Sequence, residues 1–258
     1  MLLAIDVGNT NIVLGVFNGT TLAHSWRLTT LRERTADELG ILVTSLCRHH
    51  GLGREDISGV VMASVVPPQT GTMITMVRDY FGRQPLNLEP GVNTGMPVLY
   101  DNPREVGADR VVNGIAAYEQ FARAGQRPVI VVDFGTATTF DAVSANGEYL
   151  GGVICPGPQI SADALFQRAA KLPRIDVQKP LKVIGTNTIM SMQSGLFWGY
   201  VDMVEGLVRR MRVELGGAPV VVATGGLATL VGPETQLIDH VDGDLTLRGL
   251  RIVWERNQ

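Results

Sequence analysis

Two short segments of similar sequence have the residue types that bind a polyphosphate. DVGNTN (6–11) and DFGTATT (133–139) each place an acid, a glycine and threonine hydroxyls directly after an apolar run. A carboxylate at the end of a buried strand is costly unless it meets a cation, a donor or a ligand. Glycine lets the backbone turn sharply, and neighbouring amides can cradle phosphate oxygens. One such loop alone could be a hairpin whose Asp caps its own turn, but two of them predict a kinase-like ATP clamp.

The two loops are expected to share the binding of ATP and its cations. A polyphosphate needs cations because its charges repel each other and an incoming nucleophile. Asp6 is expected to hold Mg²⁺, directly or through water, and Thr136 to contact phosphate from the second loop. The first loop is expected to contact ATP through one continuous run, Asp6, Val7, Gly8, Asn9, Thr10, Asn11, Ile12 and Val13.

Two further segments complete the candidate site. VVVATGGLATLV (220–231) has paired glycines that let a base or ribose approach the backbone, although an ordinary strand-to-helix turn is the alternative. MPVLYDNPREVGADR (96–110) lacks periodicity, and such a loop in a compact domain is usually functional. Its Asp109 could accept the proton of a substrate hydroxyl or simply cap the following helix. Arg110 offers a forked cation to a carboxylate or phosphate.

The elements that must position these residues repeat along the chain. Strand, glycine turn and returning strand occur at the start and again after GQRP, so we expect duplicated halves over 1–118 and 119–258. A capping box, Thr35 to Glu38, predicts a helix that ends at Gly51. The other expected elements are a strand stopped by prolines (59–68), helices over 70–81, 108–124, 161–170 and 188–215, and a strand over 219–226 followed by a helix.

The motifs together resemble those of type III pantothenate kinases, in the superfamily of actin, Hsp70 and the sugar kinases. The resemblance runs the whole length of the chain. It implies an α/β fold of two ribonuclease-H-like halves flanking an ATP cleft. It also implies ATP-dependent phosphorylation of pantothenate to 4′-phosphopantothenate, the first step toward coenzyme A. The matching segments are DVGNTN, SVVPP (64–68), GADR (107–110), DFGTATT, GGVICPG (151–157), GTNTIMSMQSG (185–195), ATGGLA (223–228) and the terminal LTLRGLRIVWERN.

The same resemblance assigns roles to particular residues. It implies that Asp109 is the base, that Asp133 binds K⁺ or NH₄⁺, and that Thr188 reaches the pantothenate of a neighbouring subunit in a homodimer. The pantothenate site would be formed by Tyr100, Gly107, Ala108, Asp109, Arg110 and Thr188. The helix expected over 188–215 is apolar on more than one side, which also favours a symmetric partner, although a core stripe is the alternative.

Composition indicates which partners and which cellular location to expect. A formal charge of −3 and a pI near 5.8 argue against nucleic acid as the main partner. No membrane-spanning run is present, and two cysteines in apolar surroundings, Cys47 and Cys155, suggest buried reduced thiols in a cytoplasmic protein. Two rival functions stay open: a non-catalytic regulator resembling the Bvg accessory factors, and a kinase of the same fold that acts on another small alcohol, such as a sugar, or on acetate.

Overall fold

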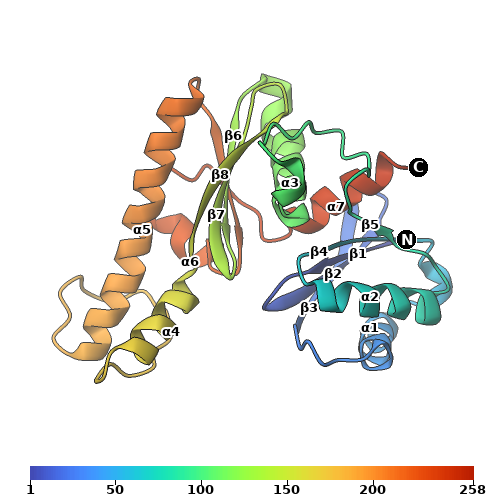
Figure 1. Cartoon of the computed structure of the whole chain (residues 1–258), viewed down its shortest axis with the longest axis horizontal. Coiled ribbons are helices and arrows are strands. Elements are labelled where there is room, and N and C mark those ends of the chain that lie inside the picture. Colours follow the sequence, from blue (N-terminus) through green and yellow to red (C-terminus); the bar gives the residue numbers. More distant parts are fainter. The chain divides into compact units, whose positions relative to one another are not determined.

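The computed structural model describes residues 1–258, which form two compact units (Figure 1). Unit 1 consists of Met1–Met96, Asn102–Ala116 and Thr246–Gln258, and unit 2 of Pro97–Asp101 and Ala117–Leu245. The expected halves, 1–118 and 119–258, therefore differ from the observed units at three places: the C-terminal segment belongs to unit 1, a short piece near Tyr100 belongs to unit 2, and unit 2 resumes at Ala117 rather than at residue 119.

Unit 1 is built on a five-stranded mixed sheet with the order β3-β2-β1-β4-β5. The hairpin β1–β2 is antiparallel, and β4 runs parallel to β1 on its other side. The strands are β1 (Leu2–Val7), β2 (Asn11–Asn18), β3 (Thr21–Thr29), β4 (Gly59–Ser64) and β5 (Leu86–Asn87).

Helices α1 (Ala36–His49) and α2 (Pro67–Met76) pack on one face of this sheet. Alternate strand residues such as Ile5 and Leu14 point into this core, as the period of two requires. The predicted capping box is confirmed: the Thr35 amide donates to a Glu38 carboxylate oxygen at 2.8 Å. The prolines of SVVPP occupy the first positions of α2 rather than ending structure, because proline's missing N–H is no loss there. A π-helical turn, Val77–Phe81, extends α2.

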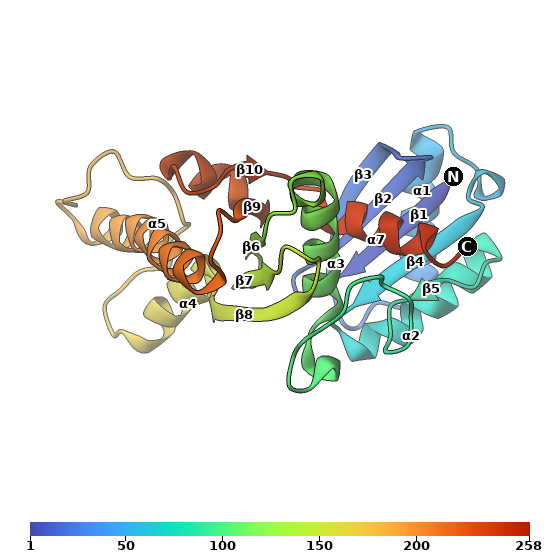
Figure 2. The same cartoon turned by 90° about the horizontal axis from the view of Figure 1, so that it is seen from above.

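The C-terminal helix α7 (Leu245–Glu255) covers the opposite face of the sheet (Figure 2). A β-carbon on Gly15 of β2 would lie 2.7 Å from a Leu247 methyl carbon. A β-carbon on Gly59 of β4 would overlap the Trp254 ring. These two glycines therefore let α7 approach the sheet closely.

The residues that follow α7 hold the irregular chain after β5. The Asn257 side chain donates to the Asn93 carbonyl at 2.8 Å, and Arg256 donates to the Thr94 carbonyl. This anchoring, together with the packing of α7, explains why the C-terminus belongs to unit 1.

Unit 2 repeats the same sheet plan. Its order, β10-β9-β6-β7-β8, places the first strand between an antiparallel hairpin partner and a parallel partner, as in unit 1. The duplication predicted from the sequence is confirmed at this level. The strands are β6 (Val129–Phe134), β7 (Ala137–Val143), β8 (Tyr149–Pro156), β9 (Val220–Gly225) and β10 (His240–Val241).

The 28-residue helix α5 (Thr188–Leu215) covers one face of the second sheet. Phe197, Val201 and Val204 pack from it onto strand residues such as Val132. The remaining elements include α3 (Ala108–Ala117), a π-helical turn (Tyr118–Ala122), α4 (Pro158–Arg168) and α6 (Ala228–Val231). No helix is long and apolar enough to span a bilayer.

Candidate active site

The DVGNTN loop forms the tight turn between β1 and β2 and is held from behind. The Gly8 amide donates to the Asn11 carbonyl at 3.0 Å. The Thr30 hydroxyl donates to the Gly8 carbonyl at 2.7 Å, and the Thr30 amide donates to the Thr10 carbonyl at 2.9 Å. Asn9 and Thr10 are exposed. The turn is therefore fixed by backbone bonds while polar groups at its tip face outward.

The residues of this loop that are predicted to contact ATP differ in whether their side chains can reach a ligand. Asp6 is partly buried and lies on the sheet face opposite α1 and α2, paired with Val13 of β2. Val7 and Ile12 are 0% and 1% exposed and belong to the core. They can therefore meet a ligand only through their backbones, whereas Asn9 and Thr10 can also use side chains.

The segment after β4 connects this turn to the GADR segment. The Val65 amide donates to the Val7 carbonyl at 3.0 Å, which continues the β1–β4 pairing by one residue. A β-carbon on Gly107 would lie 3.7 Å from a Val65 methyl carbon. Unit 1 thus brings together the DVGNTN loop, SVVPP and GADR. Sequence reasoning used SVVPP as the end of a strand and as a family motif, and did not assign Val65 this connecting position.

Asp109 folds back over the start of α3. One of its carboxylate oxygens accepts the Arg110 amide at 2.8 Å, so the helix-cap alternative describes a real contact. A β-carbon on Gly107 would lie 2.5 Å from the same oxygen, so glycine makes room for this conformation. Burial raises the pKa of Asp109, and the amide and charge of Arg110 oppose that shift. A carboxyl group with a raised pKa is typical of functional sites as well as of buried networks.

The second phosphate loop packs against the ATGG turn in unit 2. Asp133 lies at the end of β6, opposite Thr139 of β7 and Thr224 of β9. Gly225 has φ +89°, and a β-carbon there would overlap the Asp133 carboxylate and lie 2.7 Å from the Phe134 amide nitrogen. The conformational freedom of Gly225 therefore makes room for Asp133.

The helix expected after the ATGG turn is short, and the tip of the second phosphate loop is exposed. Helix α6 has only four residues, so the strand is followed by a short turn of helix and not by an extended one. Thr136 and Gly135 at the loop tip are exposed. The Thr136 carbonyl lies against Gly157, where a β-carbon would collide with it.

Tyr100 belongs to unit 2, whereas the GADR segment belongs to unit 1. Its segment pairs with the start of β8: the Leu99 amide donates to the Tyr149 carbonyl, and the Tyr149 amide donates to the Pro97 carbonyl, both at 2.8 Å. The Tyr100 ring is partly buried, 6.5 Å from the Tyr149 ring, and within van der Waals reach of Gly151. Sequence reasoning missed Tyr149, which is fully buried.

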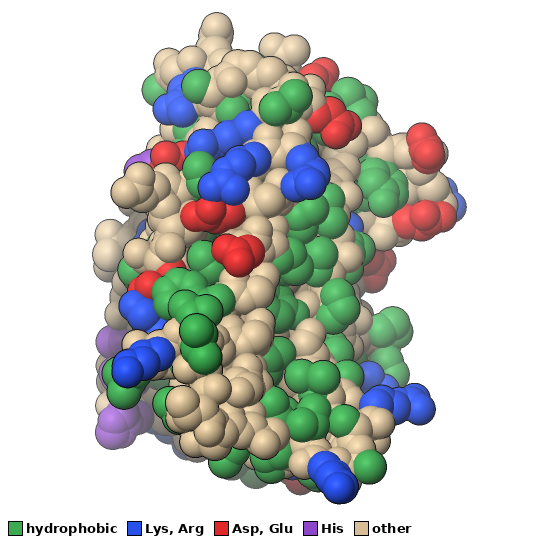
Figure 3. Space-filling model, turned by 90° about the vertical axis from the view of Figure 1, so that its left-hand side faces the viewer, with side chains coloured by type: hydrophobic (Ala, Val, Ile, Leu, Met, Phe, Trp, Pro, Cys, Tyr) green, Lys and Arg blue, Asp and Glu red, His purple; other side chains and the backbone are tan.

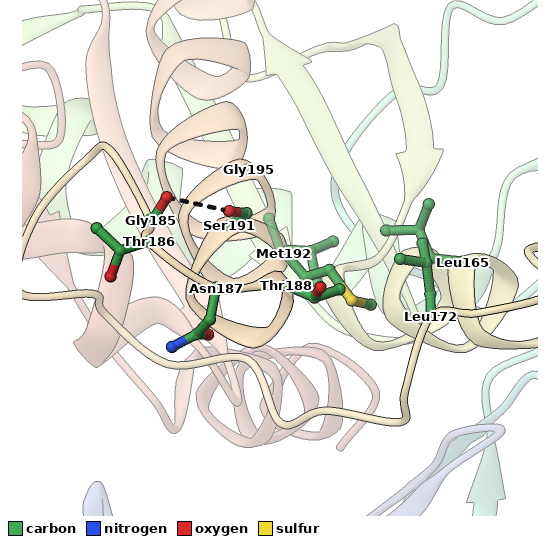
Figure 4. Close-up of a pocket in the computed structure, with 10 residues that line it drawn as sticks. Leu165, Leu172, Gly185, Thr186, Asn187, Thr188, Ser191, Met192 and Gly195 are labelled. Atoms are coloured by element: carbon green, nitrogen blue, oxygen red, sulfur yellow. Dashed lines mark hydrogen bonds between the residues drawn. The ribbon is translucent and has the colours of Figure 1, made fainter.

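Thr188 begins α5 and lines an open cavity of about 740 Å³ (Figure 4). Asn187 caps the helix by accepting the Met190 amide at 2.9 Å. Leu165 and Leu172 form the apolar side of the cavity, across from Thr188 and Met192. The exposed Thr188 hydroxyl is therefore set in a partly apolar hollow of unit 2.

Comparison with known proteins shows to which family the chain belongs. The family model for type III pantothenate kinases matches residues 2–210. The type III pantothenate kinase of Moorella thermoacetica is 57% identical over 257 residues, and that of Geobacter sulfurreducens is 54% identical over 258 residues; all chains are covered in full. This chain belongs to the type III pantothenate kinase family.

Solved structures place this pantothenate kinase in the actin-like ATPase fold. A glucomannokinase from Arthrobacter that uses inorganic polyphosphate or ATP matches with TM-score 0.55 at 14% identity, covering 100% of this chain and 99% of that one. MreB 5 of Spiroplasma citri matches with TM-score 0.54 at 10% identity, covering 99% and 96%. The predicted fold class and family are confirmed.

One structural match bears on the regulator that the sequence left open. A Campylobacter jejuni protein described as a Baf family transcriptional activator matches with TM-score 0.62 at 19% identity, covering 99% of this chain and 98% of that one. At that identity the match shows a shared fold only. The relatives above 50% identity, all pantothenate kinases over the full chain, decide the family.

Proposed function

We propose that this pantothenate kinase positions the primary alcohol of pantothenate with Asp109 and the phosphates of ATP with the DVGNTN and DFGTATT loops. The reaction follows from the family: ATP phosphorylates pantothenate, the first step of coenzyme A biosynthesis. The observation that supports the residue roles is the connection through Val65, which bonds to the end of β1 and packs beside Gly107. Val65 therefore links a phosphate-loop hairpin to the segment of a candidate base.

Asp109 orients the alcohol and accepts its proton as phosphorus leaves the bridging oxygen. Because the transition state of phosphoryl transfer is loose, positioning contributes more than basicity. Gly107, which has no side chain, makes room for this carboxylate, and Arg110, only 9% exposed, supplies charge toward the substrate carboxylate. Tyr100 forms an apolar wall for pantothenate.

The loops also have the donor chemistry for two kinds of cation. Asp6 and the exposed Asn9 and Thr10 are hard oxygen donors, which suit Mg²⁺ bound to phosphate. Asp133, held against the Gly225 backbone, offers a carboxylate suited to K⁺ or NH₄⁺. When bound, these cations neutralise phosphate charge. The chain's own residues fix the loop backbones and place Thr136 beside the phosphates.

We further propose a homodimer in which Thr188 contacts pantothenate bound by the partner subunit. Apolar side chains are exposed on and around α4 and α5, including Phe166 at 45%, Ile184 at 83% and Ile189 at 48% (Figure 3). Exposed apolar surface of this extent is typical of an interface. The cavity beside Thr188 is lined by residues of the same two helices, including Leu165 of α4 and Met192 of α5.

A complementation experiment tests the shared site. Asp109→Asn and Thr188→Glu are each expected to be inactive; a glutamate is tolerated at a helix start and repels the substrate carboxylate. Mixing and refolding the two variants together should restore about a quarter of wild-type activity, because half of the subunits' pairings are mixed and each has one intact site. Each variant refolded alone serves as the control. A mixture without activity, with dimers present, places Thr188 in its own subunit's site.

Activity with each cation is measured in the same assay. Formation of 4′-phosphopantothenate from ATP and Mg²⁺ is expected to rise with K⁺ or NH₄⁺ and to stay low with Na⁺. A turnover that is equal in all three salts excludes the proposed role of Asp133.

We also propose that the enzyme works in the cytoplasm, where ATP is available. Both thiols are free, as expected there. Cys47 is buried, whereas Cys155, against expectation, is only partly buried.

A further inference from the structure

A fully buried carboxylate in unit 2 takes no part in the proposed binding of ATP, cations or pantothenate. Asp141, in the middle of β7, is 0% exposed. It accepts the Tyr149 hydroxyl at 2.7 Å and the Thr139 hydroxyl at 3.0 Å. Burying a carboxylate costs several kcal/mol unless hydrogen bonds compensate, at about 1.5–3 kcal/mol each for bonds to a charged group. An apolar residue would serve stability as well, so the network calls for a functional explanation.

One end of this network holds the segment of Tyr100. Tyr149 is the largest of the fully buried side chains, and its backbone amide and carbonyl both bond to that segment, at Pro97 and Leu99. The Tyr100 ring rests near the Tyr149 ring and over Gly151. Fixing the Tyr149 side chain therefore fixes both the backbone and the ring environment of Tyr100.

The other end leads to the second phosphate loop. Thr139 lies directly opposite Asp133 in the β6–β7 pairing. Residues that are directly opposite share a face of the sheet, and so do residues two apart on one strand. Asp133, Thr139 and Asp141 therefore line the face away from α5, because the contacts with α5 are made by the alternate residues Ile130, Val132 and Phe134. The carboxylate lies between the proposed cation residue and the proposed pantothenate wall.

We propose that Asp141 is a positioning residue that holds Tyr149, and through it Tyr100, in the conformation that binds pantothenate. This inference rests on the proposed contact of Tyr100 with the substrate. Through Thr139 the same carboxylate links that conformation to the loop of Asp133. Loss of the Tyr149 hydroxyl loosens the Tyr100 segment, so it weakens pantothenate binding and leaves ATP binding unchanged.

A double-mutant cycle tests the proposal. Tyr149→Phe removes only the hydroxyl, and its loss is expected to raise the KM for pantothenate about tenfold with little change in the KM for ATP. Tyr100→Leu is expected to raise the same KM by at least as much. Because both act through one ring, the double variant should resemble Tyr100→Leu alone rather than show the product of the two effects.

A matched control separates positioning from general destabilisation. Tyr118 also lies in unit 2 and donates its hydroxyl to the Ala145 carbonyl at 2.8 Å, and no hydrogen bond links that hydroxyl to Asp141. Tyr118→Phe is expected to lower the melting temperature while the KM for pantothenate stays at the wild-type value. If Tyr149→Phe does not fold, Thr139→Val probes the other end of the network and should raise the same KM and the K⁺ concentration needed for half activity.

The outcomes distinguish the role of Asp141 from the substrate contact of Tyr100 on which it rests. A raised KM in Tyr100→Leu with an unchanged KM in Tyr149→Phe, or in Thr139→Val where that variant is the probe, overturns the role of Asp141 alone. An unchanged KM in Tyr100→Leu overturns the substrate contact of Tyr100 and this inference with it. Multiplying effects in the double variant also refute the coupling.

Discussion

Replacing Asp109 by Asn separates a catalytic carboxylate from a helix cap. The amide oxygen of Asn can still accept the Arg110 amide, which lies 2.8 Å from the carboxylate, so the start of α3 keeps its geometry. What is lost is the negative charge and the capacity to take a proton. Because Gly107 leaves room for either side chain, no new collision is introduced.

The expected size of the effect follows from the role. General base catalysis contributes about 10²–10⁴-fold, and a loose transition state favours the lower part of that range. We therefore expect kcat to fall about 10²–10³-fold, or roughly 3–4 kcal/mol in the barrier. The affinity for ATP should stay within about twofold, since a change of 0.4 kcal/mol corresponds to that factor.

Stability should move in the opposite direction to activity. Burial raises the pKa of Asp109, so the native state favours the protonated carboxyl. Its contribution to stability is complete below the ordinary pKa of an Asp and is lost as the pH rises through the raised pKa. Above that raised pKa the buried, ionised carboxylate lowers stability, and Asn carries no such charge. Asp109→Asn is therefore expected to melt at or above the wild-type temperature.

The assays are steady-state kinetics, nucleotide binding and thermal melting on the same preparation. In the wild type, kcat/KM should fall as the pH drops through the raised pKa of Asp109, because the ionised form is active. Asp101→Asn, at an exposed carboxylate in the neighbouring loop, serves as the control. A variant that melts lower than the wild type and keeps its kcat would show that Asp109 only caps α3.

Two further substitutions test the loops separately. Thr30→Val removes the hydroxyl that donates to the Gly8 carbonyl at 2.7 Å, and a loss of about 0.5–1.5 kcal/mol should raise the KM for ATP about 2- to 12-fold; an unchanged KM would show that the turn needs no brace. Gly225→Ala places a β-carbon against Asp133 at φ +89°, so it should abolish activation by K⁺ and cost about 1–3 kcal/mol of stability. Gly71→Ala, where a β-carbon meets nothing within 4 Å, is its control, and equal melting temperatures of the two would contradict the assignment.

Local patterns were the part of the fold that the sequence could predict. The capping box from Thr35 to Glu38 and the two acid-glycine hairpins depend on residues a few positions apart, and the structure confirms them as elements. Pro67 was misinterpreted because proline both ends strands and begins helices, and only the continuation into α2 decides between them.

Long-range pairing was beyond the reach of sequence patterns. The brace from Thr30 depends on the register of β2 and β3, and the position of Tyr100 depends on its pairing with Tyr149, far along the chain. The amphipathic pattern of α7 indicates that it must pack on something but does not say on which sheet. The roles of the candidate site residues in binding and catalysis stay predictions for the experiments above.

The placement of α7 sets the order in which the enzyme can fold on the ribosome. When Leu245 has emerged, unit 2 has all of its residues, but unit 1 still lacks Thr246–Gln258. Until α7 arrives, one face of the first sheet, around Gly15 and Gly59, has no cover. Domains commonly fold in the order of their synthesis, N-terminal first. Here the unit that begins the chain is the last to be completed, so premature termination near the C-terminus disables the half that holds Asp109.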